Sequence, residues 1–117
     1  MEFTVEFYET ESGQSPVREF LDNLERVNPD DFAIVMAGLA KLESRQYHRP
    51  PLSKSIGNDL FELRHVGKLN TRVFYFFGKG RRIITVHGIR NKAVAIPGRD
   101  RNVALRRKED WQKRNAL

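Results

Sequence analysis

The stretch DLFELRHVGKLNTRVFYFFGKG, residues 59–80, decides how this chain folds. It predicts two β-strands, at about Leu60–His65 and Asn70–Phe77, because aromatic and branched residues alternate with others between short turn sequences. The connection VGKL is short enough to make the two strands antiparallel neighbours. Side chains alternate across a strand, so Arg64 and Arg72 share one face. The other face carries Phe61, Leu63, Val73, Tyr75 and Phe77, which we expect to pack against helices.

The two arginines of this predicted hairpin have two explanations. Guanidinium groups at adjacent strand ends repel each other unless an anion lies between them. A planar, permanently charged fork is well suited to hold a phosphate, which indicates a site for nucleic acid. Alternatively, Glu62 and nearby acidic residues pair with Arg64 and Arg72 as structural salt bridges. The sequence leaves both explanations open.

A third strand, at about Arg81–Ile89, follows the short connection GKG. Alternation places Ile84 and Val86 on one face and Thr85 and His87 on the other. We expect the more polar face to be the functional one, which would bring His87 near the arginines. A histidine has an ordinary pKa of roughly 6.5 and can transfer protons near neutral pH. The alternative is a structural histidine.

The rest of the chain predicts three helices and one more strand. Residues 2–9, EFTVEFYE, alternate as a half-buried strand does. One helix begins at Pro16 and a second covers about Asp30–Ser44, while residues 44–58 are predicted to be a loop. A polar helix at Arg101–Arg114 ends the chain. The predicted order is β-α-α-β-β-β-α, an α+β fold.

Length and composition narrow the class of protein. The 117 residues are predicted to form one domain, 1–117. The chain has no cysteine, so it has neither disulfides nor a thiolate metal site. No apolar run approaches the roughly 20 residues that span a bilayer, and the acidic start is unlike a signal peptide. We therefore expect a cytoplasmic protein that works without membrane, cofactor or metal.

The charge is divided unevenly along the chain. Residues 1–43 carry 3 Lys or Arg and 10 Asp or Glu, a net charge of −7. Residues 44–117 carry 18 and 5, a net charge of +13, and the two parts together give +6. The basic part predicts binding to a polyanion such as nucleic acid. The alternative is a surface that only aids solubility.

The order of several short motifs resembles the RelE/ParE toxin superfamily, and most closely its HigB-like, phage-derived branch. The motifs are LFELR after PLSKSIG, then RVFYF, then HGIRNK, a proline and a basic helix. The resemblance covers nearly the whole chain. It implies a RelE-like fold, with a curved antiparallel sheet packed on an N-terminal helical hairpin and a C-terminal helix.

The same resemblance implies a function. It implies the toxin of a type II toxin–antitoxin pair, neutralised by a protein antitoxin that is usually a helix-turn-helix DNA-binding protein. It further implies an mRNA interferase, an endoribonuclease that cuts messenger RNA on the ribosome and so inhibits translation. Other members of the superfamily poison gyrase without nuclease chemistry. A non-catalytic module that binds nucleic acid or protein, and a degenerate toxin, are therefore the alternatives.

Individual residues match the family's basic positions. Arg64 and Arg72 match its strand arginines, Lys92 its strand-end residue and Lys54 its loop lysine. The chain departs from the branch at position 91, where Asn replaces a frequent second lysine. It also has Trp111 near its C-terminus, where some members use a catalytic tyrosine, so the general acid and base stay unassigned. The predicted catalytic residues are Arg64, Arg72, His87 and Lys92, and the predicted RNA contacts are Lys54, Arg90 and Arg49.

The expected mechanism needs no metal, because the neighbouring 2′-hydroxyl of RNA can attack the scissile phosphate. Asp59 and Glu62 are the only acids between residues 44 and 99, so no carboxylate cluster for a divalent ion is evident. We expect the two strand arginines to stabilise the transition state. His87 or Lys92 would move the protons.

Overall fold

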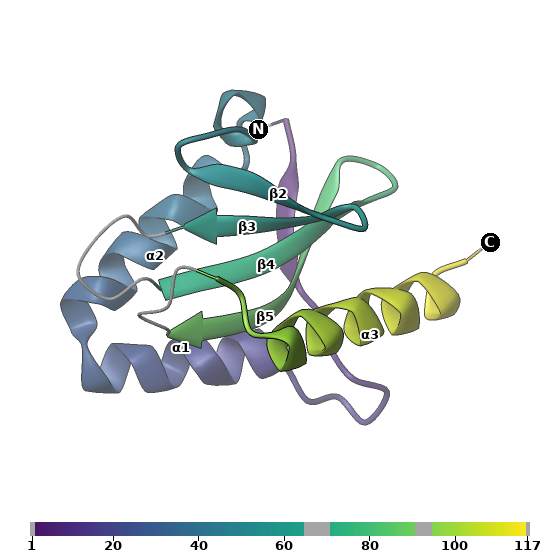
Figure 1. The fold of residues 1–117 in the computed structure, drawn as a ribbon, viewed down its shortest axis with the longest axis horizontal. Coiled ribbons are helices and arrows are strands. Elements are labelled where there is room, and N and C mark those ends of the chain that lie inside the picture. Colours follow the sequence, from purple (N-terminus) through teal and green to yellow (C-terminus); the bar gives the residue numbers. More distant parts are fainter. Residues whose placement is uncertain (1, 65–70, 91–94, 117) are drawn as a thin grey trace.

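The structure is a computed structural model that describes residues 2–64, 71–90 and 95–116. Within these residues, five strands form one sheet in the order β1-β5-β4-β3-β2, which three α-helices accompany (Figure 1). This α+β architecture confirms the RelE-like fold class. In chain order the elements are β1 (Thr4–Phe7), α1 (Pro16–Val27), α2 (Pro29–Lys41), the 3₁₀ turn η1 (Arg45–Tyr47), β2 (Ser53–Gly57), β3 (Leu60–Arg64), β4 (Thr71–Gly78), β5 (Arg82–Arg90) and α3 (Gly98–Arg114).

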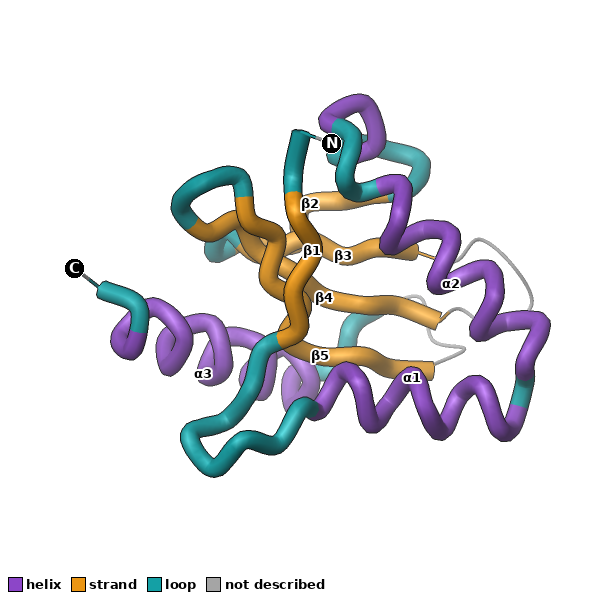
Figure 2. The backbone as a smooth tube through the Cα atoms, turned by 180° about the vertical axis from the view of Figure 1, so that it is seen from behind, coloured by secondary structure: helices purple, strands orange, loops and turns teal. Residues whose placement is uncertain are grey.

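The helices lie on both faces of the sheet. Helices α1 and α2 form a hairpin on one face, and α3 lies against the other, as the opposite views of Figures 1 and 2 show. Pro16 and Pro29 open the first two helices, where a missing N–H is tolerated. The side chain of Asn28 caps α2 by accepting the N–H of Asp31 at 3.1 Å. In the described ranges, no helix has the length and apolar character to cross a membrane.

The face toward the helical hairpin, here called the hairpin face, is apolar. Its core joins both helices to β3, β4 and β5, and the predicted alternation of β3 and β4 is confirmed there. Gly88 of β5 lets the ring of Phe20 approach closely, since a Cβ atom at this glycine would lie 2.4 Å from Phe20 Cδ2. The buried members of this core are Val17, Leu21, Leu24, Val35, Leu39, Leu42, Leu63, Val73, Tyr75 and Ile83.

The opposite face, here called the α3 face, has a smaller apolar core and many polar anchors. Helix α3 contributes the buried Ala104 and part of Trp111 to this core. Arg101 donates to the carbonyl oxygen of Ile56, and Lys108 Nζ donates to that of Asn58 at 2.6 Å. Polar contacts therefore fix much of the position of α3. The buried members of the core are Tyr8, Leu60, Phe74, Phe76, Ile84, Val86, Ile89 and Ala104.

Two parts of the sheet differ from the prediction. The segment 44–58 is not all loop, because Ser53–Gly57 pairs with β3 as the edge strand β2. Its sequence, SKSIG, has a single large apolar residue, so backbone hydrogen bonds rather than a hydrophobic pattern define this strand. The sheet is also mixed rather than wholly antiparallel, because β1 runs parallel to β5 at the other edge.

A β-bulge in β5 corrects the predicted faces of this strand. Phe74 pairs with His87 and Tyr75 pairs with Thr85, which leaves Val86 as the extra residue. The bulge turns Val86 and His87 to the same face, so the predicted separation of these two side chains is wrong. His87 still shares a face with the arginines, but Thr85 lies on the hairpin face.

Candidate nucleic-acid interface and its arginine cluster

The two arginines of the deciding hairpin are direct cross-strand neighbours. Arg64 is the last residue of β3 and pairs with Arg72 near the start of β4. Both lie on the α3 face, since Leu60 and Phe74 of the same alternating sets belong to the core under α3. The predicted juxtaposition of the two guanidinium groups is therefore present at the end of the sheet away from Gly78.

Glu62 explains how the like charges are tolerated. Its carboxylate lies between them, with Oε1 3.4 Å from Arg64 Nε and Oε2 3.7 Å from Arg72 Nε. We call these three residues the arginine cluster. The salt-bridge explanation left open by the sequence thus describes the resting geometry. Two cations on one carboxylate still leave the arginine cluster with one net positive charge.

The two arginines differ in their access to solvent. The side chain of Arg64 is 36% exposed, whereas those of Arg72 and Glu62 are only 2% and 4% exposed. Arg64 is accessible to a ligand from solvent, which would compete with its ion pair to Glu62. Arg72 cannot contact one directly in this conformation, and its charge acts through the low-dielectric interior.

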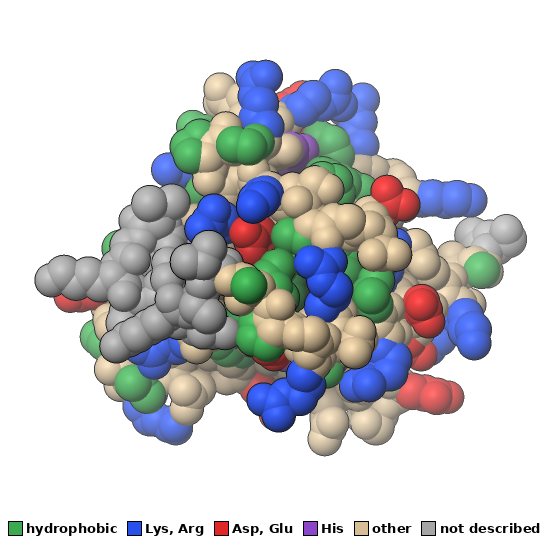
Figure 3. Space-filling view, in the orientation of Figure 1, with side chains coloured by type: hydrophobic (Ala, Val, Ile, Leu, Met, Phe, Trp, Pro, Cys, Tyr) green, Lys and Arg blue, Asp and Glu red, His purple; other side chains and the backbone are tan. Residues whose placement is uncertain are grey.

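Lys54 extends the positive charge along the same face. It pairs with Glu62 in the β2–β3 register and is exposed, so Lys54 and Arg64 flank the buried carboxylate. Figure 3 shows Lys and Arg side chains spread over the side of the molecule that carries α3, with apolar and acidic side chains between them. Such a face attracts polyanions through long-range electrostatics.

His87 is held between β5 and α3. Its Nε2 lies 2.7 Å from Asp100 Oδ1, and its Nδ1 lies 3.1 Å from the Arg107 guanidinium. Burial lowers the pKa of His87 below its ordinary value, an effect that the hydrogen bond to Asp100 partly opposes. The imidazole is thus mainly neutral at pH 7, and both ring nitrogens face α3 side chains rather than an open site.

Three predicted residues do not join this group. Arg90 is exposed and pairs with Thr71, and alternation from Ile89 places it on the hairpin side of β5. Arg49 is exposed in the segment between η1 and β2, beside a pocket on the hairpin side. Lys92 lies outside the described residues. Lys54, Arg64 and Arg72 therefore lie together on the α3 face. The functional roles of all the predicted site residues stay predictions.

The partners of His87, unlike the Glu62 partner of the arginines, were not evident from the sequence. Asp100 and Arg107, which hold His87, come from α3 and have no local signal that links them to β5. Thr71 next to Arg72 is buried and donates its hydroxyl to the buried Asp31 at the start of α2. In the described ranges, no three His, Cys, Asp or Glu side chains gather as metal ligands would.

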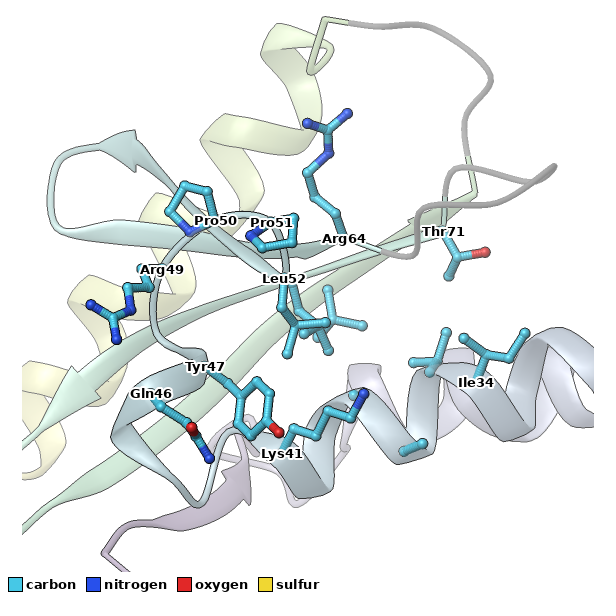
Figure 4. A pocket seen from close by; sticks show the side chains of 15 residues that line it. Ile34, Lys41, Gln46, Tyr47, Arg49, Pro50, Pro51, Leu52, Arg64 and Thr71 are labelled. Atoms are coloured by element: carbon cyan, nitrogen blue, oxygen red, sulfur yellow. The ribbon is translucent and has the colours of Figure 1, made fainter.

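A pocket of about 630 Å³ lies on the hairpin side, between α2, the segment 46–52 and the ends of β3 and β4. Figure 4 shows apolar side chains at its centre, with Lys41 and Arg49 at its margin. Arg64 borders it through the end of β3, but its side chain points away. The sequence did not indicate this pocket, because residues far apart in the chain form its walls.

The comparison with known families agrees with this geometry. A family model described as phage-derived protein Gp49-like (DUF891) matches residues 19–109, from α1 into α3. This chain belongs to the Gp49-like family. No curated protein matches the chain.

Gp49-like proteins form a RelE-type, toxin-like family of phage origin. Membership confirms the coarser part of the resemblance and is consistent with a toxin that pairs with an antitoxin. The matched range includes the arginine cluster and His87, together with the α3 residues that hold His87. The assignment to a HigB-like branch stays a prediction.

Proposed function

We propose that this Gp49-like protein is the toxin of a type II toxin–antitoxin pair and a metal-independent endoribonuclease. It cleaves mRNA, on the translating ribosome, and thereby inhibits translation. One observation carries the proposal: the half-exposed guanidinium of Arg64 lies on a basic sheet face, backed by the buried charges of Arg72 and Glu62. The HigB-like resemblance supports the choice of RNA as substrate.

Arg64 and Arg72 have separate tasks in this proposal. Arg72 neutralises the buried Glu62, so that Arg64 can leave its 3.4 Å ion pair and turn toward an RNA phosphate. There it stabilises the extra negative charge that develops when the 2′-hydroxyl attacks. Removal of one such donor typically costs about 2.7–4 kcal/mol of transition-state stabilisation. Arg72 is therefore a positioning residue, and Arg64 is the residue that touches the phosphate.

The proton transfers are assigned by elimination among the predicted residues. The ring nitrogens of His87 are engaged by Asp100 and Arg107, which favours His87 as a residue that positions α3. Lys92, two residues beyond the end of β5 in sequence, is therefore proposed for the proton step, and the family resemblance supports this choice. Lys54 and, more remotely, Arg49 and Arg90 are proposed to contact flanking phosphates.

The test follows messenger RNA in a purified translation system. Wild-type protein should generate new 5′ ends within the coding region, and the upstream fragments should end in a 2′,3′-cyclic phosphate, the product of 2′-hydroxyl attack. Arg64→Ala should slow cleavage about 100-fold or more, while Arg26→Ala, an exposed arginine on α1, should not change it. Fragments that end in a 3′-hydroxyl, or full activity of Arg64→Ala, would contradict the proposal.

A second function, a module that binds without cleaving, is favoured by two features of the same site. Arg72 is buried, and His87 is engaged at both nitrogens. The same translation assay separates the two functions. Intact message together with inhibited supercoiling by purified gyrase would identify a gyrase inhibitor, as in the ParE-like part of the superfamily.

A further inference from the structure

The pocket beside α2 has the size and lining of a binding site, and the proposed cleavage step does not take place in it, although Arg49 and Arg64 lie at its border. Its volume of about 630 Å³ falls within the roughly 300–1,000 Å³ that is typical of ligand sites. Leu52, Leu63 and Val73 form apolar walls. We call this pocket the α2 groove.

The apolar surface of the α2 groove continues outward along the helix. Ile34 lines the groove and is 50% exposed, so part of its apolar side chain lies outside the closed part of the pocket. Ala37, also exposed, lies one turn beyond Ala33, so a partner could approach the α2 backbone closely there. A surface that extends beyond a closed cavity suits a polypeptide segment better than a small molecule.

The margin of the α2 groove is positively charged. Lys41 and Arg49 border it, Lys41 lies 5.6 Å from the ring centre of Tyr47, and none of the described lining residues is acidic. An apolar floor with a basic margin complements a segment that has apolar anchors and acidic flanks. Helices of this kind dock through residues spaced three and four apart.

We propose that the α2 groove binds an amphipathic, acidic helix of a partner protein. Ile34 and Leu52 contact its apolar anchors, and Lys41 and Arg49 pair with its acidic flanks. The identification of this partner as the antitoxin rests on the proposed function, whereas the groove and the chemistry of its occupant do not. Arg64 ends the strand that forms one wall, so the bound helix would lie directly behind the residue proposed to hold RNA phosphate.

The test begins with a displayed library of random peptides of about 16 residues, some four helical turns, selected on the wild-type protein. Enriched peptides should carry apolar residues at helical spacing and an excess of Asp and Glu. Labelled copies are then titrated by fluorescence anisotropy. Ile34→Asp and Ala37→Arg should each weaken binding about tenfold or more, equivalent to ~1.4 kcal/mol, with unchanged thermal midpoints. Lys41→Glu should weaken binding and reduce its dependence on salt.

Val27→Asp is the matched control, since Val27 is 58% exposed on α1 and does not line the groove. This variant should bind as the wild type does. Peptides that bind Ile34→Asp and Ala37→Arg as tightly as wild type would overturn the proposal, as would selection of basic peptides or none. Binding of dansyl-undecanoic acid in place of any peptide would likewise overturn it, in favour of a lipid site.

The groove proposal and the nuclease proposal fail separately. Ile34→Asp should cleave message as the wild type does, because Ile34 lies on the hairpin side, whereas the side chain of Arg64 points away from the groove. In the presence of the co-expressed antitoxin, Ile34→Asp should remain toxic while Val27→Asp is neutralised. Full neutralisation of Ile34→Asp would overturn the docking proposal and leave the cleavage result intact.

Discussion

The two faces of the sheet are joined to their helices by different forces. On the hairpin face, α1 and α2 pack through apolar side chains such as Leu24 and Leu39, both nearly fully buried. On the α3 face, Ala104 is the fully buried apolar residue that the helix supplies. Hydrogen bonds and ion pairs hold much of the remainder, including Tyr8 to Asp110 at 2.6 Å and Arg107 to the carbonyl of Val86 at 2.8 Å.

The difference teaches where charge can be placed in so small a fold. The packing of the hairpin face is apolar and close, so its stability depends on the volume and shape of the side chains. A charge introduced there would be buried without a partner. The α3 face already contains polar anchors and the buried ion pair between Arg72 and Glu62. Removal of an existing buried charge should therefore perturb the α3 face strongly, whereas the hairpin face should respond most to single changes of volume.

The largest effect is expected for Arg72→Ala on the α3 face. The change removes the buried partner of Glu62, whose carboxylate is only 4% exposed. Removal of one partner from a buried pair typically costs about 3–5 kcal/mol. Urea denaturation should show a fall of this size in the free energy of unfolding, and message cleavage should be lost with the fold.

Arg64→Ala is the matched comparison, because the same carboxylate loses a partner that is 36% exposed. Its effect on unfolding should stay below about 1 kcal/mol. Combining Arg72→Met with Glu62→Gln should recover part of the stability that Arg72→Ala loses. Equal, small effects of Arg72→Ala and Arg64→Ala would show that Glu62 does not depend on the buried arginine.

On the hairpin face, Gly88→Ala should destabilise the protein by about 1–3 kcal/mol, the usual effect of overpacking. The added Cβ would lie 2.4 Å from Phe20 Cδ2. Gly98→Ala is the control, since a Cβ there meets nothing within 4 Å. Phe20→Leu should relieve part of the strain in the double variant. If Gly88→Ala unfolds at the same urea concentration as Gly98→Ala, the close packing of α1 on β5 is wrong.

How well each feature could be predicted depends on how far apart in the sequence the contacting residues lie. The faces of β3 and β4 and the pairing of Arg64 with Arg72 were predicted, because alternation and a short connection are local signals. Strand β2 was missed, because an edge strand such as SKSIG needs few apolar residues. The parallel pairing of β1 with β5 joins segments about 80 residues apart, a distance over which periodicity carries no information.

The site was less predictable than the fold. The sequence identified Arg64 and Arg72 and offered Glu62 as a possible partner, but it could not show which arginine is buried. The bulge at Val86 decided which side chains of β5 share a face with His87. Gly88 in ITVHGI is a residue type that often marks a bulge, but it does not indicate that Val86 is the extra residue. Contacts with Asp100 and Arg107 of α3 hold both ring nitrogens of His87. Such contacts between residues of different elements leave no local pattern in the sequence.

The smallest effect is expected from the pH dependence that His87 confers on the α3 face. Burial lowers the pKa of His87 in the folded protein below its ordinary value of 6.5, so the unfolded chain binds the proton more readily. Stability should therefore be highest above pH 6.5 and fall as the pH drops through 6.5 toward the folded pKa. Glu6 and Asp110, whose pKa values are lowered by Arg82 and Arg114 respectively, should act only in more acidic solution.

His87→Gln isolates this contribution, since an amide can still bond to Asp100 but does not titrate. The difference in unfolding free energy between about pH 7.5 and about pH 5.5 should shrink in His87→Gln relative to wild type. Gly88→Ala should lower stability equally at both pH values, because its defect is steric. An unchanged pH dependence in His87→Gln would show that another group titrates. His87 would then not contribute to the electrostatic difference between the α3 face and the hairpin face.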